Sequence, residues 1–179
     1  MKWKINNNIE PGDILLSTNQ NFVSTMMIPG ELSHAALYIG KTSKGDHRAI
    51  HAIEFGVIED SIWKIAKTDE IAVIRPKNIT DKERQAVIEK AKSFKGKDYD
   101  YFFSFTSTHR MCCTELVYNA YKEFKEKFNM KLKKRFMINK LSVVNTIVAD
   151  DFIKTDIDLI FTNNQARKRD VIRDYILHE

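Results

Sequence analysis

The sequence Cys113-Thr114-Glu115-Leu116-Val117 opens the segment that decides the fold. From this point, apolar side chains recur at the spacing of one face of an α-helix, while charged side chains occupy the positions between them. The apolar stripe consists of Leu116, Val117, Ala120, Tyr121, Phe124 and Phe128. The pattern predicts a helix that begins near Cys113 and carries this cysteine in its first turn.

A thiol in the first turn of a helix has the surroundings of a nucleophile. The helix dipole and the unpaired backbone N–H groups favour the thiolate. The same N–H groups, that of Cys113 foremost, can donate to the oxyanion formed when a carbonyl is attacked. A small residue buried at a helix start is the alternative interpretation of Cys113, so a second feature is needed.

Upstream of this helix, the sequence favours short strands. Four apolar runs are bounded by turn residues and predict strands at 13–17, 35–39, 49–53 and 71–74. The segment 40–46 contains Ser43-Lys44-Gly45-Asp46 and can turn the second strand back against the third. Thr80 and Glu83 have the spacing of a capping box, and the apolar residues after them predict a helix up to Gly96. Residues 142–148 fit a strand or a helix, and residues 169–177 fit a terminal helix.

Two histidines come together in this arrangement. His34 opens the second strand and supplies a base for Cys113, while His51 on the neighbouring strand can orient the His34 ring. Each histidine taken alone is more often structural than catalytic, so a catalytic role depends on their combination with Cys113. Glu54 is the alternative orienting residue, although its three-residue offset from His51 places it on the opposite strand face unless a bulge intervenes. A Cys113–His34 pair at a helix start is expected to rest as thiolate and imidazolium.

Composition sets further bounds on the protein. A chain of 179 residues with 43% hydrophobic content predicts a single domain over residues 1–179. The apolar runs are too short for a membrane-spanning helix and the N-terminus has no apolar signal core, so we expect a cytoplasmic protein. Cys112 and Cys113 are adjacent, which excludes a disulfide framework.

The net charge of +5 is spread over the chain, with basic clusters at 131–135 and 167–169. We expect no nucleic-acid binding, because no aromatic-interleaved or helix-turn-helix pattern accompanies these clusters. Weak contact with an anionic membrane surface is compatible with them. A metal site built from His34, His47, His51 and a cysteine is disfavoured, because adjacent cysteines do not have the spacing of paired zinc ligands. No cofactor or metal is expected.

Several motifs together resemble a known family. They are Gly12-Asp13-Ile14-Leu15, Ser33-His34 with the run to Gly40, Ile50-His51-Ala52, Lys97-Asp98-Tyr99-Asp100 and Cys113-Thr114-Glu115-Leu116-Val117. In this order they resemble the YiiX/YebB-like branch of the NlpC-type papain-fold cysteine hydrolases over roughly the first two-thirds of the chain. That branch is circularly permuted, with histidine before cysteine, and is similar in this to the lecithin retinol acyltransferase group.

The resemblance implies an α+β, permuted papain-like fold, in which a small, mostly antiparallel sheet or half-barrel packs against the catalytic helix. It implies that Cys113 is the nucleophile, His34 the base and His51 the third residue, where many relatives carry glutamate. The implied function is that of a cysteine hydrolase or acyltransferase acting on an amide or ester bond of a small-molecule, peptide or lipid substrate. The loops 20–31 and 101–110 are expected to shape specificity. The alternative is a non-catalytic module that binds a small ligand on the same fold.

Overall fold

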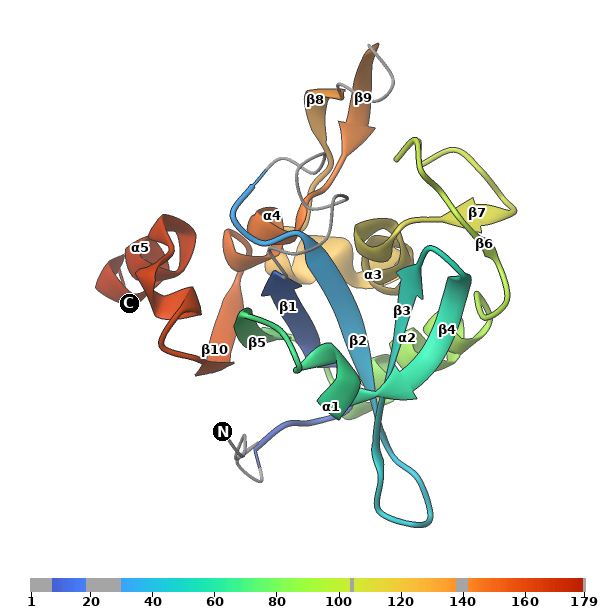
Figure 1. Ribbon diagram of the computed structural model, residues 1–179, viewed down its shortest axis with the longest axis horizontal. Coiled ribbons are helices and arrows are strands. Elements are labelled where there is room, and N and C mark those ends of the chain that lie inside the picture. The colour runs from blue at the N-terminus through green and yellow to red at the C-terminus, as the bar shows by residue number, and fades with distance from the viewer. Residues whose placement is uncertain (1–7, 19–29, 104, 138–141, 179) are drawn as a thin grey trace.

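The computed structural model describes residues 8–18, 30–103, 105–137 and 142–178. Its centre is a six-stranded sheet in the order β10-β5-β1-β2-β3-β4, in which all neighbouring strands are antiparallel (Figure 1). The strands are β1 (Ile14–Thr18), β2 (His34–Lys41), β3 (His47–Ile53), β4 (Gly56–Ser61), β5 (Glu70–Pro76) and β10 (Ile157–Thr162). This is the α+β architecture that the sequence predicts.

The four predicted strands correspond to β1, β2, β3 and β5. The turn after Gly40 pairs Lys41 with His47, and after a register shift between Gly40 and Tyr38 the pairing continues to Ala36 opposite His51, so the two strands are adjacent as expected. Both edge strands, β4 and β10, were not predicted. Their sequences GVIEDS and IDLIFT mix polar and apolar residues because each edge strand is only partly buried.

Two helices cover one face of the sheet. Helix α2 (Asp81–Lys92) begins at the predicted capping box, in which Glu83 Oε2 accepts from the Thr80 N–H at 2.9 Å. It ends shortly before the predicted stop at Gly96, which has a φ of +85° in the following turn. Helix α3 (Cys113–Tyr121) continues into the 3₁₀ helix η2 (Lys122–Phe128), so the apolar stripe is helical over its whole length.

The alternation of side chains gives the sheet two different faces. Ile14, Leu16, Ala35 and Leu37 point toward α2 and α3 and belong to the larger core, which we call the helix-covered face. Leu15, Ala36, Tyr38 and Ala49 point the other way and pack with Ile62 and Ile65 of the short helix α1 (Ile62–Ile65), which we call the α1 face. Because side chains alternate along a strand, His34, two residues from Ala36, and His51, two residues from Ala49, are expected on the α1 face.

The C-terminal third adds a hairpin and two helices. Strands β8 (Lys133–Met137) and β9 (Ser142–Thr146) form the hairpin, which settles the ambiguous segment 142–148 as a strand up to Thr146. Helix α4 (Ala149–Ile153) follows, and β10 leads through η3 (Ala166–Lys168) to α5 (Asp170–His178), the predicted terminal helix. Strands β6 (Asp98–Tyr99) and β7 (Arg110–Met111) form a short parallel pair before α3. Among the helices of the described residues, none is long and apolar enough to cross a membrane.

Candidate functional site

The start of α3 holds both cysteines, and both are buried. Cys112 is the N-cap residue and Cys113 is the first residue of the helix. Glu115 Oε2 accepts from the Cys112 N–H at 3.4 Å, which satisfies one donor of the helix start. Cys113 therefore has the first-turn position that the sequence predicts.

The thiol of Cys113 lies beside the beginning of β2. Its Sγ is 3.9 Å from the carbonyl oxygen of Ser33, the residue before His34. The backbone N–H groups of Ala35, Thr114 and Cys113 itself stabilise the thiolate and lower the pKa, but burial has the larger effect and raises the pKa of the thiol above its usual value. Cys113, at the start of α3, therefore lies against the backbone of the residue that directly precedes β2.

His34 and His51 form a direct pair across β2 and β3. Nε2 of His34 lies 3.0 Å from Nδ1 of His51, and the two rings meet edge to face. The strand register produces this contact, since His51 lies opposite Ala36, two residues along β2 from His34. This contact occupies Nε2 of His34 and not its Nδ1.

Burial keeps the two rings neutral. Desolvation, followed by the charge of His51, lowers the pKa of His34 to about 3. Desolvation also lowers the pKa of His51 to about 4, with the Asp60 carboxylate acting in the opposite direction. Together with the raised pKa of Cys113, these directions favour a resting thiol and a neutral imidazole. The predicted resting thiolate–imidazolium pair is therefore not supported, because burial of both groups outweighs the helix start.

Glu54 does not occupy the orienting position. It lies in the exposed turn between β3 and β4, beyond the end of the strand, whereas His51 is buried and bonded to His34. The bulge that would have brought Glu54 onto the face of His51 does not occur, since β3 and β4 pair without interruption from Arg48 to Ile53.

A carboxylate from the C-terminal third fixes the chain that leads into His34. Asp150 of α4 accepts from the backbone N–H groups of Glu31 and Leu32, each at 2.8 Å. Gly30 has a φ of +120°, and a Cβ at this position would lie 2.8 Å from Asp150 Oδ2, so the backbone and carboxylate are in close approach. We call residues 30–32 with Asp150 the Asp150 clamp.

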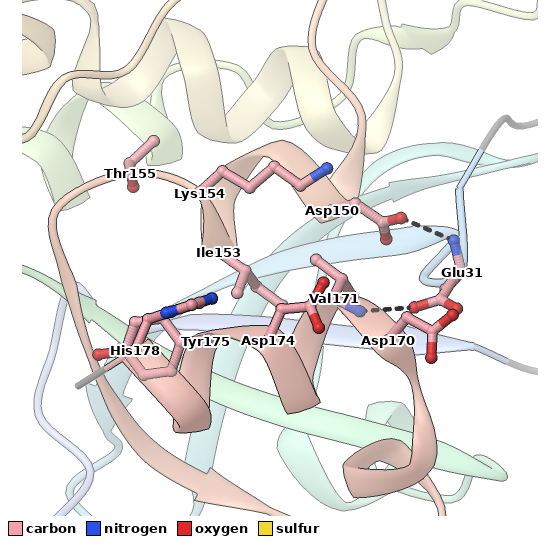
Figure 2. Close-up of a pocket in the computed structure, with 10 residues that line it drawn as sticks. All are labelled: Glu31, Asp150, Ile153, Lys154, Thr155, Asp170, Val171, Asp174, Tyr175 and His178. Atoms are coloured by element: carbon pink, nitrogen blue, oxygen red, sulfur yellow. Dashed lines mark hydrogen bonds between the residues drawn. The ribbon is translucent and has the colours of Figure 1, made fainter.

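The same segment binds the start of α5. Glu31 Oε2 accepts from the Val171 N–H at 2.9 Å, and Figure 2 shows both this bond and the bond from Glu31 to Asp150. These residues line a surface pocket of about 500 Å³ between α4 and α5, to which Cys113, His34 and His51 do not contribute.

The predicted specificity loops are only partly visible. Residues 20–29 and 104 lie outside the described residues. In the second loop, Phe103 packs against Cys112, with Tyr99, Phe105 and Val144 around them. Phe103 and Phe105 both have a φ near +50°, a left-handed conformation that costs a non-glycine residue on the order of 1 kcal/mol or more. Strained backbone therefore lies beside the cysteine pair.

The disfavoured metal site is not assembled. His47 lies at the opposite end of β3 from His51, where Nδ1 of His47 is 2.8 Å from the Tyr38 hydroxyl. Over the parts of the chain that the structure describes, no group of three or more His, Cys, Asp and Glu residues is arranged to hold a metal ion.

Three polar residues near the site were not predicted to take part in it. Burial raises the pKa of Glu115 to about 7, and burial followed by the charges of Cys113 and Cys112 raises the pKa of Tyr99 far above its usual value. Tyr99 and Glu115 belong to the recognised motifs, so their position in sequence was a usable signal. Asp150 belongs to no such motif, and only the fold reveals its contact.

Comparisons with known proteins show the fold and the family of the chain. Comparison with curated protein sequences finds no match. Among solved structures, the chain is similar to the crystal structure described as the metalloprotein yiiX of Escherichia coli O157:H7, with a TM-score of 0.68 and 16% identity over 86% of this chain and 97% of that one. Residues 8–170 match the family described as permuted papain-like amidase enzymes, YaeF/YiiX, C92 family. The chain therefore belongs to the C92 family of permuted papain-like amidases.

Proposed function

We propose that this protein hydrolyses an amide or ester bond through an acyl-enzyme on Cys113, with His34 as the base and His51 as the orienting residue. The observation that carries the proposal is the hydrogen bond between His34 Nε2 and His51 Nδ1, on a strand whose preceding residue, Ser33, has its carbonyl oxygen 3.9 Å from the buried Cys113 thiol. A base held by a third polar group next to a helix-start thiol is the arrangement that nucleophilic catalysis needs.

The proposed steps assign one task to each of these groups. His34 Nδ1 takes the proton of Cys113 as Sγ attacks the substrate carbonyl carbon, and the carbonyl oxygen becomes an oxyanion. The Cys113 backbone N–H, at the unpaired start of α3, is the donor for that oxyanion. The intermediate collapses when His34 returns the proton to the leaving nitrogen or oxygen, which leaves a thioester. Water then attacks the thioester, His34 takes its proton, and the carboxylic acid is released as the thiol is reprotonated.

His51 sets the tautomer of the base. For Nδ1 of His34 to accept a proton, the neutral ring must carry its hydrogen on Nε2 and donate it to Nδ1 of His51. His51 then carries its own hydrogen on Nε2, which is buried and has no hydrogen-bond partner among the described residues. Because a neutral pair is favoured, proton transfer accompanies attack instead of preceding it.

The identity of the acceptor separates a hydrolase from an acyltransferase. The family description favours an amidase, and with it water as the acceptor. The related yiiX is described as a metalloprotein, but the described residues of this chain contain no group of three or more His, Cys, Asp and Glu residues that could hold a metal, and no step here passes through one. A binding module without turnover is the second candidate, favoured by the closed surroundings of Cys113, which is only 1% exposed.

A trapping experiment tests the mechanism. The protein is incubated with a panel of peptide amides, amino-acid amides and lipid esters, and the peptide containing the two cysteines is sequenced by mass spectrometry. We expect an acyl mass on Cys113, which Cys113→Ala removes together with turnover and which Cys112→Ala leaves in place. Turnover that survives Cys113→Ala would contradict the mechanism. Binding of a panel member without adduct or turnover would favour the binding module.

A further inference from the structure

The β8–β9 hairpin has two faces of different character. On the inner face, Lys133 Nζ and Arg135 Nη2 each lie 2.8 Å from Asp151 Oδ1, which anchors the hairpin to α4. On the outer face, Phe136 lies opposite Val143, and these side chains are 58% and 62% exposed. Large apolar side chains that an anchored hairpin exposes to solvent indicate an interaction site.

More exposed aromatic side chains lie on two neighbouring segments. Tyr101 and Phe102 follow β6 and are 59% and 50% exposed, and Phe55, in the turn between β3 and β4, is 81% exposed. The Tyr101 hydroxyl donates to the carbonyl oxygen of Glu54 at 3.4 Å, which joins the loop to that turn. The turn and the loop therefore form one neighbourhood.

The hairpin belongs to the same neighbourhood as the cysteine pair. Val144 of β9 packs against the cluster formed by Phe103 and Cys112. Cys112 directly precedes Cys113, the proposed nucleophile, in the sequence. Figure 1 places the hairpin and the segment between β6 and β7 at the same end of the molecule, where α3 begins. We call the five exposed side chains on the hairpin, the loop after β6 and the β3–β4 turn the apolar rim: Phe55, Tyr101, Phe102, Phe136 and Val143.

Positive charge accompanies the hairpin part of the apolar rim, whereas two exposed acids, Glu54 and Asp98, adjoin the turn and the loop. Lys134 lies on the outer face of the hairpin opposite Asn145 and is exposed, Lys131 is exposed just before β8, and Arg110 is exposed at the start of β7. The chain as a whole carries a net charge of +5. Aromatic and aliphatic side chains interspersed with cations match the boundary between lipid headgroups and acyl chains of an anionic bilayer.

We infer that the protein docks through the apolar rim and Lys134 on bilayers that contain anionic lipids, and that its substrate is an amide or ester held in such a bilayer. The inference rests on the proposed function for the substrate, whereas the docking surface stands on exposure and charge alone. A bilayer suits this surface better than a protein partner, because the apolar groups protrude from three separate segments and are interrupted by cations, whereas a protein interface needs a continuous apolar centre.

Docking is measured without turnover, using the Cys113→Ala protein. The protein is sedimented with vesicles of phosphatidylcholine alone and with vesicles that contain about a third phosphatidylglycerol. We expect binding to the anionic vesicles only, and weaker binding as salt is raised, because salt screens the lysine contribution. Equal binding to both vesicles, or binding to neither, would overturn the inference.

Surface variants locate the contact. Lys134→Glu should weaken vesicle binding at least about fivefold, and the double change Phe136→Ser with Val143→Ser about tenfold. Leu177→Ser is the matched control, since Leu177 is 72% exposed on α5, away from the apolar rim. Circular dichroism checks the fold of each variant, and Lys134→Glu changes only an exposed side chain. If all these variants bind like the control, the docking surface is wrong.

The two proposals fail separately. An acyl-enzyme formed from a water-soluble amide by a protein that does not bind vesicles would overturn the docking surface and keep the mechanism. Vesicle binding that depends on Lys134 and Phe136, with no adduct on Cys113 from any lipid substrate, would support the surface and reject the catalytic proposal. Specific capture of a protein partner that Phe136→Ser abolishes, with no vesicle binding, would replace the bilayer by that partner.

Discussion

The two faces of the sheet contribute differently to the candidate site. The helix-covered face holds the larger core and presents Cys113 on α3, whereas the α1 face has the smaller core and the parity of His34 and His51. The two sides approach each other at the start of β2, because the Cys113 thiol lies 3.9 Å from the carbonyl oxygen of Ser33, and His34 is the next residue and the first of the strand. The site therefore depends on where β2 begins and on its register with β3, and not on either core alone.

Removing the histidines tests the α1 side of the site and should give the largest effect. His34→Ala should lower kcat/KM by about 10³-fold or more, because the base itself moves the proton. His51→Ala should lower it by about 10- to 100-fold, because it only orients the base. Glu54→Gln, in the exposed turn, is the matched control and should leave the rate unchanged. The measurement is steady-state hydrolysis of whichever substrate traps an acyl-enzyme, and a larger loss at Glu54 than at His51 would contradict the assignment.

Neighbouring leucines on β1 compare the two cores directly. Leu16 points to the helix-covered face and Leu15 to the α1 face, and both are fully buried. Leu16→Ala should destabilise the protein by about 4 kcal/mol and Leu15→Ala by about 2 to 3 kcal/mol, because the larger core closes less readily around a cavity. Denaturant unfolding measures both values. Equal losses would show that the small core is packed as rigidly as the large one.

The neighbouring acids Asp150 and Asp151 separate positioning of the base from general stability. Both are buried on α4, but Asp150 holds the backbone before His34 and Asp151 holds the hairpin cations. Asp150→Asn places an amide donor against one of two backbone N–H groups, so we expect roughly a tenfold loss of kcat with little change in KM. Asp151→Asn should cost comparable stability and leave kcat unchanged. Equal losses of kcat in both variants would show that the Asp150 clamp contributes to stability and does not position His34.

The cap of α3 should give the smallest effect, visible as a pH dependence of stability. The pKa of Glu115 is raised from an ordinary 4.5 to about 7, so the folded state holds its proton more tightly than the unfolded state does. Its contribution is fully favourable below pH 4.5 and is lost as the pH rises toward 7. Glu115→Gln should therefore gain stability relative to the wild type across this window, by at most about 3 kcal/mol.

Thermal unfolding at a series of pH values measures the difference between the two proteins. His34 and His51, whose pKa values are lowered, make the stability of both proteins rise with pH over a partly overlapping range, so only the difference reports on Glu115. A difference that does not change with pH would show that Glu115 titrates normally.

The sequence by itself determined the local features of this protein. The apolar stripe after Cys113 predicted the helix and its first-turn thiol, and alternating short runs predicted the four inner strands. These patterns are readable because helix periodicity, capping and turn residues act within a few positions of one another. The edge strands β4 and β10 escaped prediction, because their pairing comes from a neighbour strand and not from their own apolar content.

The tertiary structure decided what depends on distant contacts. The contact of His34 with His51, and not with Glu54, follows from strand pairing, in which β3 and β4 pair without interruption. The backbone before His34 is held by Asp150, which is 116 positions away in the chain from His34. The charge state of the site was decided in the same way. A helix start lowers the pKa of a thiol, but the burial that raises it comes from the packing of separate elements, which no local pattern contains.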